Sequence, residues 1–178
     1  MSPLVKYSLR FIMLLLLQYL LSSLEPLGRF ITPYIYFIYI LWLPFTISRF
    51  WIMVLACVYG LGCDFLLLTP GLHAAACVLI AYFRSFLINI LIPGETSEVT
   101  YTEPSVKSMG LAPYSVYILV LTFIHHGYLV FLQWLDVGSM GYFLVKVMMT
   151  TAVSLLLITA AELVVTRKQK TRSSLRES

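Results

Sequence analysis

The stretch from Tyr59 to Ala76, YGLGCDFLLLTPGLHAAA, decides the fold of this chain. It places Asp64, His73 and three glycines inside sequence that is otherwise apolar. A charge at membrane depth costs about 2.5–3.5 kcal/mol even on lenient insertion scales, so such residues are kept for a structural or functional reason. Thr69-Pro70-Gly71 is typical of a tight turn. The stretch therefore predicts two membrane-embedded helices joined by a short turn.

The composition supports a membrane protein throughout. Of the 178 residues, 60% are hydrophobic and 11% are charged, and the mean hydropathy is +0.91. Soluble domains carry about 25% charged residues. Since one helical span needs about 20 mostly apolar residues, the chain has room for about six spans and no separate soluble domain. We expect an all-α integral membrane protein, built as a single bundle of six transmembrane helices.

Apolar runs and turn residues set the expected boundaries within one transmembrane domain, residues 1–166. The expected spans are residues 9–24, 30–47, 50–68, 72–92, 111–134 and 142–165. A basic cytoplasmic tail follows, residues 167–178. The longest connection, residues 95–109, contains alternating β-branched residues that favour a short hairpin. Alternating aromatic residues in the second span could suggest a barrel strand, but apolar runs of this length argue against it.

Basic residues near the span ends predict the orientation, because cytoplasmic loops are enriched in Lys and Arg. With six spans, one side carries most of these residues: Lys6, Arg10, Arg49, Lys107 and the tail. The loops on the other side keep only Arg29. We therefore expect both termini in the cytoplasm.

Asp64 and Lys146 are expected at similar depth below the outer face. Asp64 lies about 6 Å inside the third span, at 1.5 Å per residue. One interpretation is an ion pair between Asp64 and Lys146. The other is that Asp64 caps the helix that begins near Leu72, or is hydrated at the interface, while Lys146 extends towards the headgroups.

Arg84 is the deepest positive charge in the sequence. It follows His73 by eleven residues, so both side chains lie on one helix face, about 16 Å apart. Arg84 either extends to the cytoplasmic headgroups or lines a polar groove between helices. We favour the bundle interior, because arginine facing lipid is disfavoured.

His125 and His126 are adjacent in the fifth span, a pattern that could indicate a metal site, a proton relay or contacts between helices. Adjacent residues on a helix point about 100° apart, so both rings cannot easily bind one ion. Hydrogen bonds to neighbouring helices are the better interpretation. Glu162, near the cytoplasmic end of the sixth span, is expected to meet basic residues at the headgroups.

The sequence predicts no enzyme. It has no intramembrane Ser-His, His-Glu-x-x-His or Asp-Asp pattern and no phosphate-binding loop, which are the parts that hydrolysis and phosphoryl transfer need. Its three cysteines lie in apolar stretches without metal-ligand spacing. We expect no catalytic, cofactor or metal site, and no nucleic-acid partner.

Small residues predict a close contact between the third and fourth spans. Gly60, Gly62 and Ala56 give the third span a small-residue patch, and residues 74–76 give the fourth span another. Small residues allow helix backbones to approach closely in lipid, where no hydrophobic drive holds helices together. We expect a tight hairpin closed on the outer side.

Two groups of residues, Gly60-Leu61-x-x-Asp64 and Gly71-Leu72-His73-Ala74, resemble the motif of the MreD family of rod shape-determining membrane proteins. Other residues agree with the layout of that family: Pro33, Pro44, Trp51 and Arg84. The resemblance is strongest over residues 29–92. The aromatic second span and the long loop before the fifth resemble Bacteroidetes-type members.

The resemblance implies a non-enzymatic partner of MreC in the elongation complex (elongasome) that inserts lateral peptidoglycan and sets cell shape. In this complex a RodA-type glycosyltransferase and its transpeptidase are further partners, and MreB filaments lie on the cytoplasmic side as an indirect partner. The implied location is the bacterial cytoplasmic (inner) membrane. The family is also similar in helix number and size to substrate-binding subunits of vitamin transporters.

Two functions are compatible with these features of the sequence. A scaffold would spend its polar residues on helix packing and bind a partner's transmembrane segment. A small-molecule-binding subunit of a transporter would need converging polar groups in a closed cavity, and the candidates are His73, Asp64, Lys146 and Gln133. The basic tail is expected to bind either anionic lipid or protein.

Overall fold

The computed structural model describes residues 2–23, 31–92, 102–134 and 139–177. Its long helices are α1 (Pro3–Ser23), α3 (Arg49–Leu67), α4 (Leu72–Leu91), α6 (Leu111–Trp134) and α7 (Met140–Glu177). Two short helices are α2 (Ile38–Leu41) and α5 (Val106–Met109). No strand occurs in these residues, and five helices are long and apolar enough to cross a membrane. The chain is an all-α, multi-pass membrane protein.

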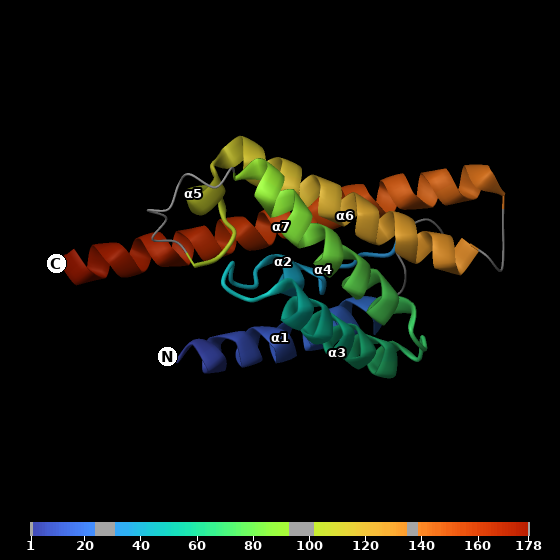
Figure 1. Cartoon of the computed structure of the whole chain (residues 1–178), viewed down its shortest axis with the longest axis horizontal. Coiled ribbons are helices and arrows are strands. Elements are labelled where there is room, and N and C mark those ends of the chain that lie inside the picture. The colour runs from blue at the N-terminus through green and yellow to red at the C-terminus, as the bar shows by residue number, and fades with distance from the viewer. Residues whose placement is uncertain (1, 24–30, 93–101, 135–138, 178) are drawn as a thin grey trace.

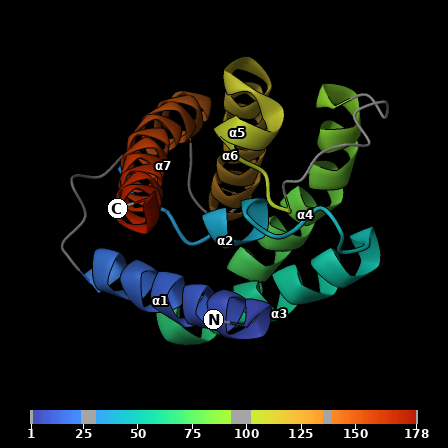
Figure 2. The same cartoon turned by 90° about the vertical axis from the view of Figure 1, so that its left-hand side faces the viewer.

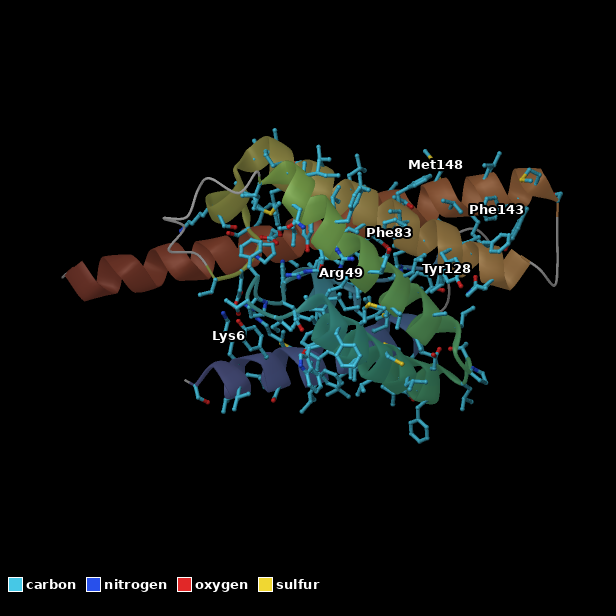
Figure 3. The ribbon with its side chains drawn as sticks, in the orientation of Figure 1. Lys6, Arg49, Phe83, Tyr128, Phe143 and Met148 are labelled. Carbon is cyan, nitrogen blue, oxygen red and sulfur yellow. The ribbon has the colours of Figure 1, made fainter. Side chains whose placement is uncertain are left out.

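The five long helices surround α2 (Figures 1 and 2). In the order of the chain, α1 packs on α3, α3 on α4, α4 on α6 and α6 on α7. Both chain termini lie at one end of the long axis (Figure 1), which we call the termini end. The turn between α3 and α4 lies at the other end, which we call the hairpin end. Lys6 marks the first end in Figure 3, and Phe143 lies towards the second.

The prediction of a helical second span over residues 30–47 is wrong. The described part of this stretch is irregular from Ile31 to Ile35 and helical only from Ile38 to Leu41, with turns on either side. Every residue from 33 to 44 is buried. We call residues 33–44 the crossing segment.

The crossing segment nevertheless passes from one end of the bundle to the other (Figure 1). Near the hairpin end, Gln18 of α1 binds the backbone of Ile35. Just beyond the segment, Phe45 N donates to Thr102 O over 3.0 Å, close to the termini end. Extended residues advance about 3.3 Å each, so a partly extended chain covers the thickness of the hydrocarbon layer in fewer residues than a helix needs.

The prediction of a helical second span is wrong because an apolar run carries limited information. It shows that a segment avoids water, but not whether lipid or protein surrounds it. Irregular backbone at membrane depth is tolerated only where protein buries it. Here five helices surround the segment, so a continuous helix is not required.

Other boundaries also differ from the expected ones. Helix α7 continues to Glu177, so the described part of the predicted tail is helical. Residues 93–101, which hold most of the predicted hairpin, lie outside the described residues. The described part of that loop forms α5, a single turn whose Ser105 and Ser108 side chains cap each other's backbone N–H groups.

Glu103 ties this loop to α1 at the termini end. Its carboxylate accepts hydrogen bonds from Lys6 Nζ, from Tyr7 Oη at 2.7 Å and from Arg10 Nη1 at 2.9 Å. Burial alone would raise the pKa of Glu103, but these three hydrogen bonds and the charge of Arg10 outweigh it and lower the pKa below its ordinary value.

We predict an acid-dependent loss of stability that Glu103→Gln removes. Because the folded pKa is lowered, the ionised carboxylate contributes its full stabilisation above about pH 5, and this is lost as the pH falls through the lowered pKa. Allowing for solvent screening, the contribution is about 1 kcal/mol. Thermal unfolding in detergent should show a wild-type advantage over Glu103→Gln at neutral pH that shrinks towards pH 3, while Lys107→Gln tracks the wild type. An advantage independent of pH would contradict this account.

Candidate functional site

The candidate site begins at the junction of α3 and α4, where Asp64 caps the N-terminus of α4. Asp64 Oδ1 accepts a hydrogen bond from His73 N at 2.9 Å, and Oδ2 accepts one from Ala74 N at 3.0 Å. A carboxylate here satisfies backbone donors that the helix leaves free and faces the positive end of its dipole. The capping interpretation is therefore confirmed, and the alternative interpretation, an ion pair between Asp64 and Lys146, is not: Lys146 binds Gln133 instead.

The side chains of Thr69 and His73 complete this junction. Thr69 Oγ1 donates to Asp64 Oδ1 at 3.0 Å. His73 Nδ1 lies 2.9 Å from Asp64 Oδ1, and the two side chains are 2% and 4% exposed. Since an ionised carboxylate only accepts hydrogen bonds, Nδ1 carries the proton, and Nε2 of a neutral His73 is an acceptor.

Gly60 allows the two helices to meet. A Cβ added to Gly60 would lie 2.4 Å from Ala74 Cα, closer than any real contact. Ala56, one turn earlier on α3, is fully buried. Gly62 does not share this contact, because its nearest neighbour is the Leu15 side chain of α1, 3.4 Å from an added Cβ. The expected role of Gly62 in packing α3 against α4 is wrong, since residues 60 and 62 point to different sides of a helix.

The turn between the helices needs unusual backbone conformations at two positions. Leu68 ends α3 in the left-handed region, with φ at 57°. Gly71 also has a positive φ, 78°, and a glycine adopts this at no steric cost. The Gly71-Leu72-His73-Ala74 sequence thus supplies both the turn and the capped backbone of α4.

A second set of buried polar side chains holds the hairpin-end half of the crossing segment. The Gln18 amide donates to Pro33 O at 3.2 Å and accepts from Ile35 N at 2.9 Å. Ser154 Oγ of α7 accepts from Tyr34 N at 3.3 Å. These bonds satisfy backbone groups that an extended chain cannot satisfy by itself.

Arg84 and Tyr117 hold the half near the termini. Arg84 Nη2 donates to Leu43 O, and Arg84 Nε donates to Tyr117 Oη at 3.1 Å. Tyr117 Oη donates in turn to Leu41 O at 2.9 Å. Arg84 is only 2% exposed, so the expectation of a position inside the bundle is confirmed. None of the ion pairs in the described residues includes Arg84.

Both histidines of α6 bind neighbouring elements, as expected. His125 Nε2 lies 2.7 Å from Tyr36 Oη of the crossing segment. His126 Nε2 lies 2.9 Å from Ser154 Oγ of α7, and its Nδ1 donates to Thr122 O at 2.7 Å. The adjacent rings therefore serve two separate contacts.

Glu162 binds two aromatic side chains among the described residues. Its carboxylate accepts from Trp42 Nε1 at 2.7 Å and from Tyr114 Oη. The side chains of the basic residues that follow Glu162 in α7 lie outside the described ones, so the expected contact with them stays a prediction. The Arg10 guanidinium of α1 lies 5.5 Å from the centre of the Trp42 ring. Trp42 thus connects α1 to α7 through the crossing segment, a position that the linear sequence does not reveal.

The four residues considered for a ligand site form two pairs. Lys146 Nζ donates to Gln133 Oε1 at 3.0 Å, while Asp64 and His73 bind each other. Their hydrogen-bonding capacity is in large part used within the protein.

Sequence reasoning missed Gln18, Ser154, Tyr117 and Glu103. Gln18 gave the clearest signal, since it is a side-chain amide within the apolar run of the first span. Tyr117 and Ser154 gave none, because tyrosine and serine are common in membrane helices. Gln18, Ser154 and Tyr117 share a backbone partner in the crossing segment, whereas Glu103 lies in a loop and binds side chains of α1.

No family model, curated protein or solved structure matches this chain. A functional assignment therefore depends on the geometry described above.

We predict that Asp64→Asn is better tolerated than Asp64→Leu. The amide oxygen of asparagine still accepts a backbone N–H, so its cost should be about 1 kcal/mol. Leucine leaves the N–H groups of His73 and Ala74 and the His73 ring without an acceptor, which should cost about 3 kcal/mol or more. Thermal unfolding in detergent measures both, with Phe65→Leu, at an 83% exposed position of α3, as the control. Equal losses in the two Asp64 variants would contradict the capping role.

We also predict opposite effects for two Gly→Ala changes. Gly60→Ala forces α3 away from Ala74 and should destabilise by about 1–3 kcal/mol. Gly127→Ala, on α6, should be neutral or stabilising by up to about 1 kcal/mol, because an added Cβ meets nothing within 4 Å. The free energy of unfolding of each variant is the measurement. A neutral Gly60→Ala would show that the helices do not approach as described.

Proposed function

We propose that this chain is a non-enzymatic membrane scaffold of the MreD type, which binds MreC and helps organise lateral peptidoglycan synthesis and rod shape. One observation carries the proposal. The residues of the MreD-like motif, Gly60, Asp64, His73 and Ala74, form a single junction between α3 and α4. Because these residues fix how two helices pack together, the motif fits a protein that acts by presenting a rigid surface.

The buried polar side chains away from the motif support the same proposal. Gln18, Arg84 and Tyr117 bind backbone carbonyls of the crossing segment rather than converging on a place where a substrate could react. Polar groups used in this way rigidify a bundle, because each bond fixes two elements relative to each other. A rigid bundle is what a scaffold offers to a partner helix.

The proposed setting is the cytoplasmic membrane of a bacterium, with both termini in the cytoplasm. Both termini lie at one end of the bundle (Figure 1), Lys6 lies near that end in Figure 3, and the C-terminal residues of α7 include several Lys and Arg. An excess of basic residues marks the cytoplasmic side. This orientation would place the basic end of α7 near the MreB side of the complex and near anionic headgroups.

The alternative function, a small-molecule-binding subunit of a transporter, is less well supported. It requires Asp64, His73, Lys146 and Gln133 to converge on one ligand. In the bundle they are engaged as two separate pairs instead. Among the described residues, no specific contact favours this alternative over the scaffold.

Co-purification tests the proposal. The tagged chain and MreC from the same bacterium are co-expressed, solubilised in mild detergent and isolated through either tag. We expect MreC with the wild type and with Gly127→Ala, and loss of MreC with Gly60→Leu. Depletion of the chain should convert rods to round cells. A folded wild type that never retains MreC, with rod shape unchanged on depletion, would refute the proposal.

Steric variants then locate the partner surface without disturbing the core. Leu16 of α1 and Met148 of α7 are 58% and 61% exposed, and Met148 points away from the bundle in Figure 3. Leu16→Trp and Met148→Trp should both fold, because each adds volume outside the bundle. A scaffold predicts that at least one position around the bundle loses MreC at normal protein level, and a scan of further exposed positions extends the test.

A further inference from the structure

Four aromatic side chains form a buried cluster where the crossing segment meets α3, α4 and α6. They are Tyr36, Tyr59, His73 and His125, and we call them the central cluster. The centre of the Tyr36 ring lies 5.4 Å from that of His73, 5.3 Å from that of His125 and 6.1 Å from that of Tyr59. All four side chains are buried.

Three polar atoms of this cluster have no hydrogen-bond partner among the described residues. They are Tyr59 Oη, His73 Nε2 and His125 Nδ1. A buried donor or acceptor left unpaired costs about 1–3 kcal/mol. Buried polar groups are nearly always paired with protein or with ordered water. Three such atoms, each on a ring packed beside Tyr36, point to a bound molecule.

The contacts of the two histidines define the chemistry of that molecule. His73 donates from Nδ1 to Asp64, which makes Nε2 an acceptor. When the Tyr36 hydroxyl donates to His125 Nε2, the proton of a neutral His125 is on Nδ1, which is then a donor. The molecule must both donate and accept hydrogen bonds.

The molecule is also uncharged. No group of three or more His, Cys, Asp or Glu side chains in the described residues could hold a metal ion. Among the described residues, Asp64 is the carboxylate that contacts His73, and its charge is already satisfied by two backbone N–H groups and two side chains. Nothing in the cluster compensates a further charge.

We propose that the central cluster is an internal binding site for water, the smallest neutral molecule that donates and accepts hydrogen bonds. Water donates to His73 Nε2, accepts from His125 Nδ1 and reaches Tyr59 Oη through a second molecule where one cannot span the distance. Buried water of this kind typically makes about three hydrogen bonds. This site is independent of the scaffold function and of any partner.

Removal of one hydroxyl tests the site. Tyr59→Phe keeps the ring and its packing against Phe11 and Tyr39 and removes only Oη. If Oη binds water, the variant loses a hydrogen bond, and the folding equilibrium constant should fall by about 2–10-fold. Tyr117→Phe, which loses bonds to Leu41 and Arg84, shows the size of a direct loss. An unchanged or higher constant for Tyr59→Phe would overturn the proposal, because a dry, unpaired hydroxyl is better removed.

A second measurement does not depend on how the variants fold. A high-resolution structure of the wild type in lipid should contain non-protein density within about 2.7–3.2 Å of His73 Nε2. Absence of that density, in a map that resolves water elsewhere in the protein, would also overturn the proposal.

Discussion

The backbone of the crossing segment must find hydrogen-bond partners inside the membrane, and the rest of the bundle is arranged around that constraint. Lipid offers no partner, and each unpaired group would cost several kcal/mol. Gln18 and Ser154 supply partners to one half, and Tyr117 and Arg84 supply them to the other. Without these four side chains the segment would have to become a helix or leave the bundle.

The junction at Asp64 satisfies the same constraint for α4. Its carboxylate binds the first free N–H groups of that helix, so the hairpin of α3 and α4 forms a fixed wall beside the crossing segment. Because Gly60 has no Cβ, α3 packs closely against Ala74 of α4. The rings of Tyr34 and Tyr36 in the crossing segment lie against His73 of α4. We infer that the motif and the crossing segment form one rigid unit, and rigidity is the property that a scaffold needs.

Sequence reasoning was most successful where the interaction is local. The hairpin of α3 and α4 follows from Pro70-Gly71 and from small residues, and burial of Arg84 follows from the cost of arginine in lipid. One kind of error concerns the direction in which a side chain points around its helix axis. Similar depth left an ion pair between Asp64 and Lys146 open as one interpretation, but depth does not say which way a side chain points. The apolar run of residues 30–47 hid an irregular segment, because hydropathy does not distinguish burial in protein from burial in lipid.

The backbone conformation of the crossing segment in a bilayer tests the account most directly. Solid-state NMR of labelled protein in lipid gives carbon chemical shifts that separate extended from helical residues. We expect non-helical shifts for Thr32, Tyr34 and Ile35, and helical shifts over Ile38–Leu41. Continuous helical shifts from residue 31 to residue 47 would contradict the account, since Gln18, Ser154, Tyr117 and Arg84 would then have no irregular backbone to hold.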